Sequence, residues 1–446
     1  MSLYEHWQQT RERFGDAMAL RDGRADRSWT FDAIQTEVDR LPASGGRVAF
    51  PAGFSVSLIF ETLRAWRDGA VLCPVEKAGA EPEAALFEKL PPEVRHVKLT
   101  SGSTGAPRLV LFEGGALAAD ARKIVSTMGL RPEWPNLGVI SMAHSYGFSN
   151  LVLPLLLHGI PLVWLGDPLP GAVGEALAGG GAEPRGWTLP AVPAMWRAWH
   201  EGGALSDRVR LAISAGSPLP VDLEAAIFAR SGVKVHNFYG SSECGGIAYD
   251  RSETPRAAPG ATGTAMDETA LSVNDDGCLE VRGPSVGLGY WPPEGETESG
   301  DDAATRLGDG VFVTSDLAAI DPVSGAVALA GRRDDLINVA GRKISPARVE
   351  SAIARVEGVR HAVVFGVPSP VDTRGEEIVA VVNFRGHDSS PAEAEFRELV
   401  RAATESLAPH EAPRHWHFQA DLVPDARGKI SRHRWRERFL REPGSR

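Results

Sequence analysis

Hydroxyl and glycine residues are concentrated at positions 99–108, which read Leu-Thr-Ser-Gly-Ser-Thr-Gly-Ala-Pro-Arg. Glycines let a backbone turn tightly and present its N–H groups to an anion, and hydroxyls add donors. Arg108 adds a positive charge, but no Lys-Ser/Thr pair ends the segment as in a P-loop. The alternative is a flexible linker, which fits poorly between the strand-like runs 94–99 and 109–112. We therefore expect a phosphate-binding loop.

A second group of polar side chains occupies positions 237–243, Asn-Phe-Tyr-Gly-Ser-Ser-Glu. An aromatic ring before a glycine can stack on a nucleotide base, and the Ser242 hydroxyl can contact a phosphate. Glu243 offers a hard carboxylate oxygen of the kind that Mg²⁺ prefers. Taken alone, Glu243 is more typical of an acid at a helix N-terminus.

Three further residues have chemistry to offer but common structural alternatives. Asp316 follows a strand-like run, where an aspartate is usually a turn or cap residue. Lys429 lies after a glycine and before a basic tail, whereas an isolated lysine is normally a solvated surface charge. His144 precedes Ser-Tyr-Gly-Phe and could equally be a histidine of the core.

The elements that must position these residues alternate between strand and helix. Helical spacing at 60–67 lies among strand candidates at 70–74, 139–142, 161–165, 209–213 and 233–238. Such alternation predicts a mainly parallel sheet covered by helices. From 271 to 344, short strands with Gly and Asp turns indicate an antiparallel barrel or meander. Beyond it we expect helices at 346–356 and 391–407 and strands at 362–367 and 378–384.

The fold class is therefore α/β, and α+β overall, in two domains. We expect a large N-terminal domain at 1–333 and a small, mobile C-terminal α+β domain at 334–446. The charged run 331–335 suits an exposed joint, although a simple β-turn inside one domain would look the same. The Gly-rich stretch 178–182 indicates a surface loop.

Composition narrows the class of protein. The chain has 446 residues, of which 43% are hydrophobic and 24% charged, as in an ordinary soluble protein. Its net charge of −11 argues against a nucleic-acid partner. Its three cysteines show no paired spacing, which fits a reducing cytoplasm. The most apolar stretch, 151–166, contains prolines and a histidine, so we expect no membrane anchor.

In their order along the chain, these motifs resemble those of the adenylate-forming superfamily, which includes acyl- and aryl-CoA synthetases, peptide-synthetase adenylation domains and firefly luciferase. The loop resembles T-S-G-[ST]-T-G-x-P-K-G, with Arg108 in place of Lys, and 239–243 resembles Y-G-x-T-E. The segment 313–316 resembles T-G-D, with Ser315 in place of Gly. The run 331–346 resembles G-R-x-D-D-x-I-x-x-x-G-x-[RK]-[IL]-x-P, and 424–432 resembles the family's lysine motif.

The resemblance implies a set of site residues. It implies nucleotide contacts from Thr100, Ser101, Gly102, Ser103, Thr104, Gly105, Arg108, Gly216, Ser217, Pro218, Asn237, Phe238, Tyr239, Gly240, Ser242, Asp316, Arg332 and Lys343. It implies catalytic roles for Lys429, Glu243 and His144, with Glu243 on Mg²⁺. It implies an acyl pocket at His144, Tyr146, Gly147 and Phe148. Asp334 would be the hinge of the small domain, and Gly341 would line the tunnel of the incoming thiol.

The implied reaction is ATP-dependent. A carboxylate attacks the α-phosphorus of Mg·ATP, pyrophosphate leaves, and a thiol then takes the acyl group from the acyl-AMP. Coenzyme A is the expected acceptor, with the phosphopantetheine of an acyl carrier protein as the alternative; the basic tail 432–438 could bind either or be a solvated helix face. A non-catalytic nucleotide- or acyl-binding protein is the rival class. No Asp lies between 144 and 157, where the peptide-synthetase domains carry one for the substrate amine, so the resemblance argues against an amino acid. The apolar and aromatic neighbourhood of Tyr146 and Phe148 favours an aromatic or medium-chain acid, and we expect a monomer or homodimer.

Overall fold

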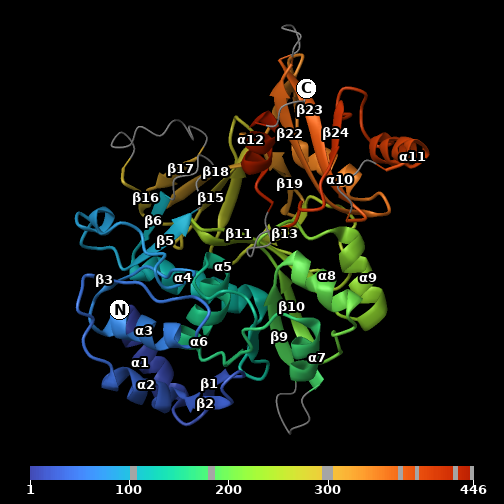
Figure 1. Ribbon diagram of the computed structural model, residues 1–446. Coiled ribbons are helices and arrows are strands. Elements are labelled where there is room, and N and C mark those ends of the chain that lie inside the picture. The colour runs from blue at the N-terminus through green and yellow to red at the C-terminus, as the bar shows by residue number, and fades with distance from the viewer. Residues whose placement is uncertain are drawn as a thin grey trace. The chain divides into compact units, whose positions relative to one another are not determined.

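The computed structural model describes residues 1–100, 108–178, 186–293, 305–369, 375–386, 391–424 and 430–441 (Figure 1). The chain forms two compact units. The first comprises 1–272, 280–314 and 320–327, and the second comprises 273–279, 315–319 and 328–446. A large unit of sheets and helices is followed by a smaller α+β unit, which confirms the expected fold class. The functional boundary at 333/334 stays a prediction.

The main sheet of the first unit is parallel at its centre. In the order β11-β10-β9-β7-β8, its central strands are β11 (Val235–Ser241), β10 (Val209–Ser214), β9 (Trp187–Ala191), β7 (Asn136–Gly138) and β8 (Leu162–Trp164). Strand β1 (Met18–Asp22) continues it parallel to β8 and pairs antiparallel with β2 (Arg27–Thr30). On the other side, β12 (Gly245–Tyr249) and β13 (Ala261–Ala265) run antiparallel. Every residue of β9 is buried, as expected for a strand covered on both faces.

One predicted strand is misplaced. The strand expected at 139–142 lies earlier, as β7, and residues 139–142 leave the sheet while their side chains stay largely in the core. The backbone N–H of Met142 donates to the carbonyl of Gly53 at 3.0 Å, so the segment is held without a ladder. The strands expected at 70–74, 161–165, 209–213 and 233–238 are confirmed, the first as β4 (Val71–Leu72).

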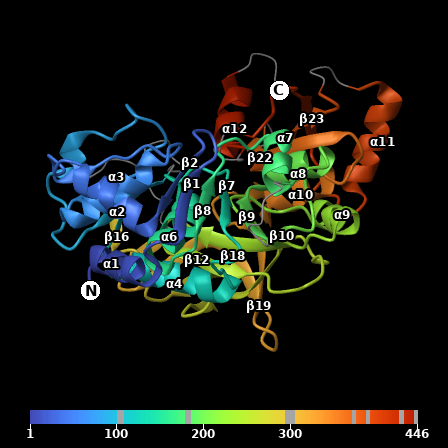
Figure 2. The ribbon, with the colours of Figure 1, turned by 90° about the horizontal axis from the view of Figure 1, so that it is seen from below.

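The helices of the first unit cover this sheet. Helices α1, α2 and α3 pack against one another, and α2 also contacts β1 and β2 (Figures 1 and 2). Helix α4 packs on α6 and on β12. The bounds are α1 (Leu3–Phe14), α2 (Phe31–Arg40), α3 (Ser57–Arg67), α4 (Gly114–Met128), α5 (Ser145–Gly147), the π-helix η2 (Phe148–Val152), α6 (Leu153–His158), α7 (Pro170–Ala178), α8 (Pro193–Glu201), α9 (Val221–Ser231) and the 3₁₀-helix η1 (Ala84–Phe87).

A second sheet of the first unit carries the expected phosphate loop. Its order is β16-β6-β5-β4-β3, with β16 (Gly289–Trp291), β6 (Arg108–Phe112), β5 (His96–Thr100) and β3 (Val48–Ala49). Strands β5 and β6 are antiparallel and pair Thr100 with Arg108. The two residues that flank the loop are therefore held face to face, and the strand-like runs around it are confirmed.

The second unit has its own apolar core. Strands β22 (Val359–Pro368) and β23 (Glu376–Phe384) are antiparallel, and β24 (His415–Phe418) adds in parallel. Helices α10 (Pro346–Ile353), α11 (Glu393–Thr404) and α12 (Arg432–Arg441) accompany the hairpin of β20 (Ile337–Val339) and β21 (Arg342–Ile344). The helices and strands expected beyond 344 are thus confirmed. Four strands are divided between the units: β14 (Ala270–Val273), β15 (Cys278–Arg282), β18 (Val311–Ile320) and β19 (Ala326–Arg332), with β17 (Arg306–Gly308) paired to β18.

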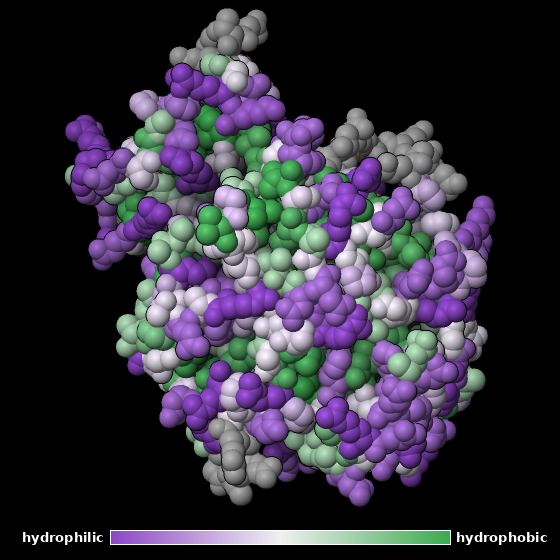
Figure 3. Space-filling model, turned by 180° about the vertical axis from the view of Figure 1, so that it is seen from behind, coloured by the Kyte–Doolittle hydropathy of each residue, from purple (hydrophilic) through white to green (hydrophobic). Residues whose placement is uncertain are grey.

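Among the residues that the structure describes, no helix is both long enough and apolar enough to cross a bilayer. On the face drawn in Figure 3, small groups of apolar residues lie between hydrophilic ones. The three cysteines are free and buried.

Candidate functional site

The carboxyl ends of β9, β10 and β11 bring several predicted residues to one edge. Because β10 and β11 are parallel and pair Ser214 with Asn237, the turn at 216–218 begins where β11 continues beyond β10 through residues 238–240, which pair with β12. Gly216 has a φ of +90°, which favours glycine at the start of that turn. In open α/β sheets, ligands bind at such carboxyl edges.

Glu243 lies in a tight turn between β11 and β12, not at a helix N-terminus. Its Oε1 accepts a hydrogen bond of 3.2 Å from the Tyr290 hydroxyl, and the Tyr290 ring lies 4.1 Å from the guanidinium of Arg108. Burial and the Glu243 carboxylate both raise the pKa of Tyr290, so its hydroxyl stays a donor. The geometry therefore brings the predicted metal ligand and the flank of the phosphate loop to one tyrosine.

Residues 144–148 lie beside that turn. The Ser145 hydroxyl donates to the Ser242 hydroxyl at 3.0 Å, and the Tyr146 hydroxyl donates to the carbonyl of Ile213 at 3.0 Å. Phe148, by contrast, is 1% exposed, and its ring packs 4.6 Å from that of His96. Tyr146 thus reaches the sheet edge, whereas Phe148 belongs to the core.

Gly147 and His144 are constrained by their neighbours. A Cβ on Gly147 would lie 1.9 Å from the carbonyl oxygen of Ser141, so only glycine fits there. His144 Nε2 lies 2.8 Å from Oε1 of Glu76, which also accepts from the Ser141 hydroxyl at 2.9 Å. A carboxylate at this distance favours a fixed orientation of the imidazole ring.

The central part of the expected phosphate loop and the expected catalytic lysine lie outside the described residues. These are Ser101, Gly102, Ser103, Thr104, Gly105 and Lys429. The flanks are described: the Thr100 hydroxyl donates to the carbonyl of Arg108 at 3.0 Å. The Gly-rich stretch 178–182 is described only at its first residue.

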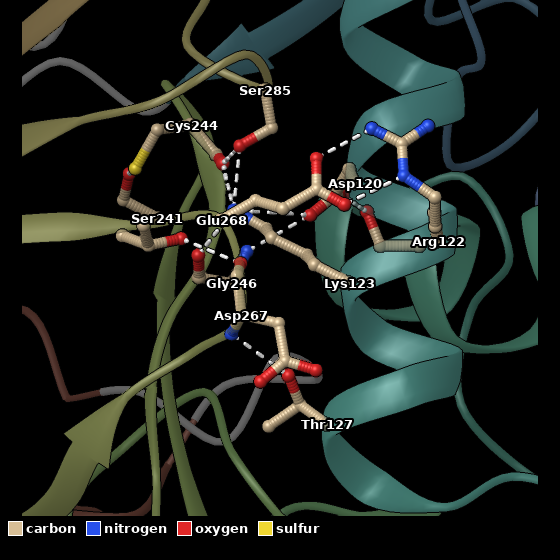
Figure 4. A network of polar contacts seen from close by, with 12 residues as sticks. Asp120, Arg122, Lys123, Thr127, Ser241, Cys244, Gly246, Asp267, Glu268 and Ser285 are labelled. Atoms are coloured by element: carbon tan, nitrogen blue, oxygen red, sulfur yellow. Dashed lines mark hydrogen bonds and ion pairs between the residues drawn. The ribbon is translucent and has the colours of Figure 1, made fainter.

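Two charged residues of α4 were missed by sequence reasoning. Lys123 and Asp120 are 1% and 2% exposed, and both contact the segment 241–246 that includes Glu243 (Figure 4). Lys98 on β5 is also buried, which lowers its pKa, and its ammonium lies 4.5 Å from the ring of Phe112. A charged pair at i, i+3 among the apolar positions of a helix was the available signal for α4.

In the second unit, the predicted ribose residue has a basic partner. Arg332 Nε donates to the Ser315 hydroxyl at 2.8 Å and lies 3.8 Å from Asp316 Oδ1. Ser315, the departure from the family's glycine, is therefore the hydrogen-bond partner of Arg332. Arg332 and Asp316 are partly exposed, so their charges are available to a polar ligand.

The remaining predicted residues of this unit lie near the β20–β21 hairpin. Asp334 occupies the turn between β19 and β20, and Lys343 is exposed on β21. Gly341 has a φ of +82° with no described atom within 4 Å of a hypothetical Cβ. Glycine is thus required there by conformation, and its role in a thiol tunnel stays a prediction.

The basic tail forms α12 and is largely engaged within the second unit. Arg432 donates to both oxygens of Glu350 at 2.9 Å, to the carbonyl of Val364 at 2.8 Å, and to Asp335. Burial opposes its charge, but the two carboxylates outweigh that effect and raise the pKa of Arg432. Arg432 therefore links α12 to Asp335, which lies in the same turn as Asp334.

The site fits a metal ion that is bound partly by the protein and partly by the phosphates of a substrate. Among the described residues, no cluster of three or more His, Cys, Asp or Glu side chains could hold an ion by itself. Mg²⁺ is commonly bound through one or two carboxylates plus substrate phosphates. The single partly exposed carboxylate of Glu243, beside the flank of the expected phosphate loop, fits that mode.

Comparison with known proteins finds relatives of similar sequence. The chain is 27% identical over 374 residues to the long-chain-fatty-acid–CoA ligase of Bacillus subtilis strain 168, covering 79% of this chain and 63% of that protein. It is 29% identical over 358 residues to the benzoate–CoA ligase of Thauera aromatica, covering 76% and 64%. The chain thus spans under two thirds of both relatives.

Solved structures show the same fold. The crystal structure of ATP-bound MatB from Rhodopseudomonas palustris superposes with a TM-score of 0.82 at 22% identity, covering 99% of each chain. The sequence model described as AMP-binding enzyme C-terminal domain matches residues 348–429. The model described as AMP-binding enzyme matches residues 49–291, more than half of the 446 residues. The chain therefore belongs to the AMP-binding enzyme family.

Proposed function

We propose that this protein is an acid–thiol ligase that activates a carboxylic acid as acyl-AMP with release of pyrophosphate and then passes the acyl group to coenzyme A. The observation that carries the proposal is the meeting of Glu243, Tyr290 and Arg108, with Ser242 in the same turn. The proposal is supported by a carboxylate, hydroxyls and a cation that meet at Arg108, the residue that flanks the loop expected to bind phosphate. Two relatives with similar sequences are CoA ligases by name.

In this proposal the chain works by positioning and by charge. Arg108 and the hydroxyls of Thr100 and Ser242 orient the phosphates, while Asp316 and Arg332 serve the ribose. Bound Mg²⁺ would neutralise phosphate charge as pyrophosphate leaves, held on the protein side by Glu243. Lys429 would bridge the carboxylate and the α-phosphate, because a compact ammonium stabilises charge that develops there.

The second half-reaction needs space for a thiol. We propose that the C-terminal domain turns about Asp334, which withdraws Lys429 and brings Gly341 to the site, whereas Lys343 serves the nucleotide phosphates. His144 and Tyr146 would face the acid at the mouth of the acyl pocket. We propose an aromatic or medium-chain acid and a cytoplasmic enzyme, monomeric or homodimeric.

The alternative acceptor is the phosphopantetheine of an acyl carrier protein. The structure gives this alternative no special support, since Arg432, Arg436 and Arg438 of α12 already bind groups of the second unit. Acyl transfer should therefore be measured in parallel to coenzyme A and to a phosphopantetheinylated carrier protein. Transfer to the carrier alone would replace coenzyme A in the proposal.

The proposal is tested by carboxylate-dependent exchange of radioactive pyrophosphate into ATP, over a panel of aromatic and aliphatic acids. Exchange should appear with at least one acid and vanish without any acid. ATP binding without exchange across the panel would favour the rival reading, a non-catalytic nucleotide-binding protein.

A further inference from the structure

We infer that Lys123 and Asp120 are positioning residues, which hold the turn of Ser242 and Glu243 in the shape that receives Mg·ATP. The inference rests on the proposed function and adds two residues whose side chains bind the backbone of the turn. Both belong to α4, and their side chains point toward the start of β12 (Figure 4).

The Lys123 ammonium forms hydrogen bonds to backbone carbonyls at the end of the turn. Its Nζ donates to the carbonyl of Cys244 at 3.2 Å, to the carbonyl of Gly246 at 2.5 Å and to the Ser285 hydroxyl at 2.5 Å. A lysine ammonium has three donors, and these contacts use all of them. The carbonyl of the residue directly after Glu243 is thereby fixed.

Asp120 completes the support and supplies the opposite charge. Its Oδ1 accepts from the backbone N–H of Gly246 at 3.0 Å and lies 3.8 Å from Lys123 Nζ, and its Oδ2 accepts from the Ser149 hydroxyl at 2.6 Å. A Cβ on Gly245, whose φ is +70°, would lie 2.0 Å from Oδ1. The turn therefore approaches this carboxylate as closely as only glycine allows.

A neighbouring segment fixes the turn from another side. The Ser285 hydroxyl donates to the carbonyl of Cys244 at 2.8 Å, and the backbone N–H of Gly287 donates to the carbonyl of Glu243 at 2.8 Å. The carbonyls of Glu243, Cys244 and Gly246 are thus all bound by groups outside the turn. These three carbonyls are therefore held in place and cannot turn toward a ligand.

The cost of burying these charges suggests a role in the site. A buried ion pair is seldom more stabilising than apolar residues of the same volume, so stability alone gives little reason for one. Groups that orient a metal ligand strongly influence metal affinity without touching the metal. Asp120 and Lys123 can orient Glu243 in this way, because both side chains form hydrogen bonds to the backbone that follows Glu243, at Cys244 and Gly246.

The test compares Lys123→Met with a matched control, Lys234→Met. Lys234 is another paired lysine of the first unit, with a side chain that is 8% exposed and Nζ 2.6 Å from Glu224 and 2.6 Å from Asp250, but it precedes β11 and lies at the opposite end of that strand from the turn. ATP binding is measured by calorimetry with and without Mg²⁺ and with no carboxylic acid present, so that no turnover is involved.

Lys123→Met should bind metal-free ATP as the wild type does, yet lose affinity for Mg·ATP by roughly tenfold or more. Lys234→Met should keep both affinities. An unchanged Mg·ATP affinity in Lys123→Met, or equal losses in the two variants, would overturn the inference. If Lys123→Met does not fold, Ser285→Ala removes one contact to the same turn and should weaken Mg·ATP binding by roughly fivefold; no change there would equally overturn it.

A failure of the proposed function can be distinguished from a failure of the positioning role. A wild-type protein without carboxylate-dependent exchange contradicts the proposed function itself. Normal wild-type exchange together with unaltered Mg·ATP binding in the Lys123 and Ser285 variants contradicts the positioning role alone.

Discussion

Replacing Arg432 by methionine should loosen the second unit selectively. Arg432 is the one side chain in the described part of α12 that joins Glu350 and Asp335, and it also donates to the carbonyl of Val364. Methionine keeps much of the apolar length but none of the donors. Two partly buried carboxylates would lose the cation that neutralises them.

The size of the effect follows from burial. Removing one partner of a fully buried ion pair costs about 3–5 kcal/mol. Here the side chains of Arg432, Glu350 and Asp335 are 23%, 21% and 30% exposed, so water recovers part of the loss. The lower end of the range, about 3 kcal/mol, is therefore expected. Arg438→Met is the control on the same helix, because its bond to Asp421 joins side chains 39% and 62% exposed. Such surface pairs contribute about 0–1 kcal/mol.

Hydrogen–deuterium exchange of the full-length protein can locate the change. Amides of β22 and α10 should exchange faster by roughly 100-fold in Arg432→Met, and by less than about tenfold in Arg438→Met. Peptides from α1 to α3 should be unaffected. Equal protection loss in the two variants, or none in either, would refute the role given to Arg432.

Three further outcomes are expected. Gly147→Ala should destabilise the fold by about 3 kcal/mol or more in urea unfolding, since its Cβ would meet the Ser141 carbonyl at 1.9 Å; a loss under about 1 kcal/mol would contradict that geometry. Tyr290→Phe should weaken Mg·ATP binding by roughly fivefold in calorimetry, because Glu243 loses one donor, and unchanged binding would count against it. Burial lowers the pKa of His158 from 6.5 to about 4, so the unfolded chain takes up a proton that the folded chain refuses, and stability should fall as pH decreases from 6.5 to about 4, by about 3 kcal/mol at most. His158→Gln should flatten that part of the pH–stability curve, and an unaltered slope would exclude His158 as its source.

The elements were predictable where hydrophobic pattern and burial coincide. Strands β10 and β11 and the antiparallel pair β22 and β23 are largely buried runs bounded by turn residues, and such runs have few other solutions. The run 139–142 shows the limit. This run is equally apolar, but it is buried beside Gly53 and does not pair with a neighbouring strand. Hydrophobic periodicity cannot distinguish a buried strand from such a buried irregular segment.

The site was predictable to the extent that its chemistry lies in local motifs. Ser242, Glu243 and Arg108 come from such motifs, and the fold brings two of them to Tyr290. Tyr290 lies beside Trp291 on the short strand β16, so its role depends on the pairing of β16 with β6, which sequence alone does not reveal. Asp120 and Lys123 were missed because a charged pair on a helix is usually taken as solvated.

The most direct test follows one oxygen atom through the reaction. An accepted acid is labelled with oxygen-18 in its carboxylate and incubated with Mg·ATP and coenzyme A, and the nucleotide product is analysed by mass spectrometry. If the carboxylate attacks the α-phosphorus and the thiol then cleaves the anhydride at the acyl carbon, AMP carries one labelled oxygen and pyrophosphate carries none. Label in inorganic phosphate, accompanied by ADP, would show attack at the terminal phosphorus and contradict the account.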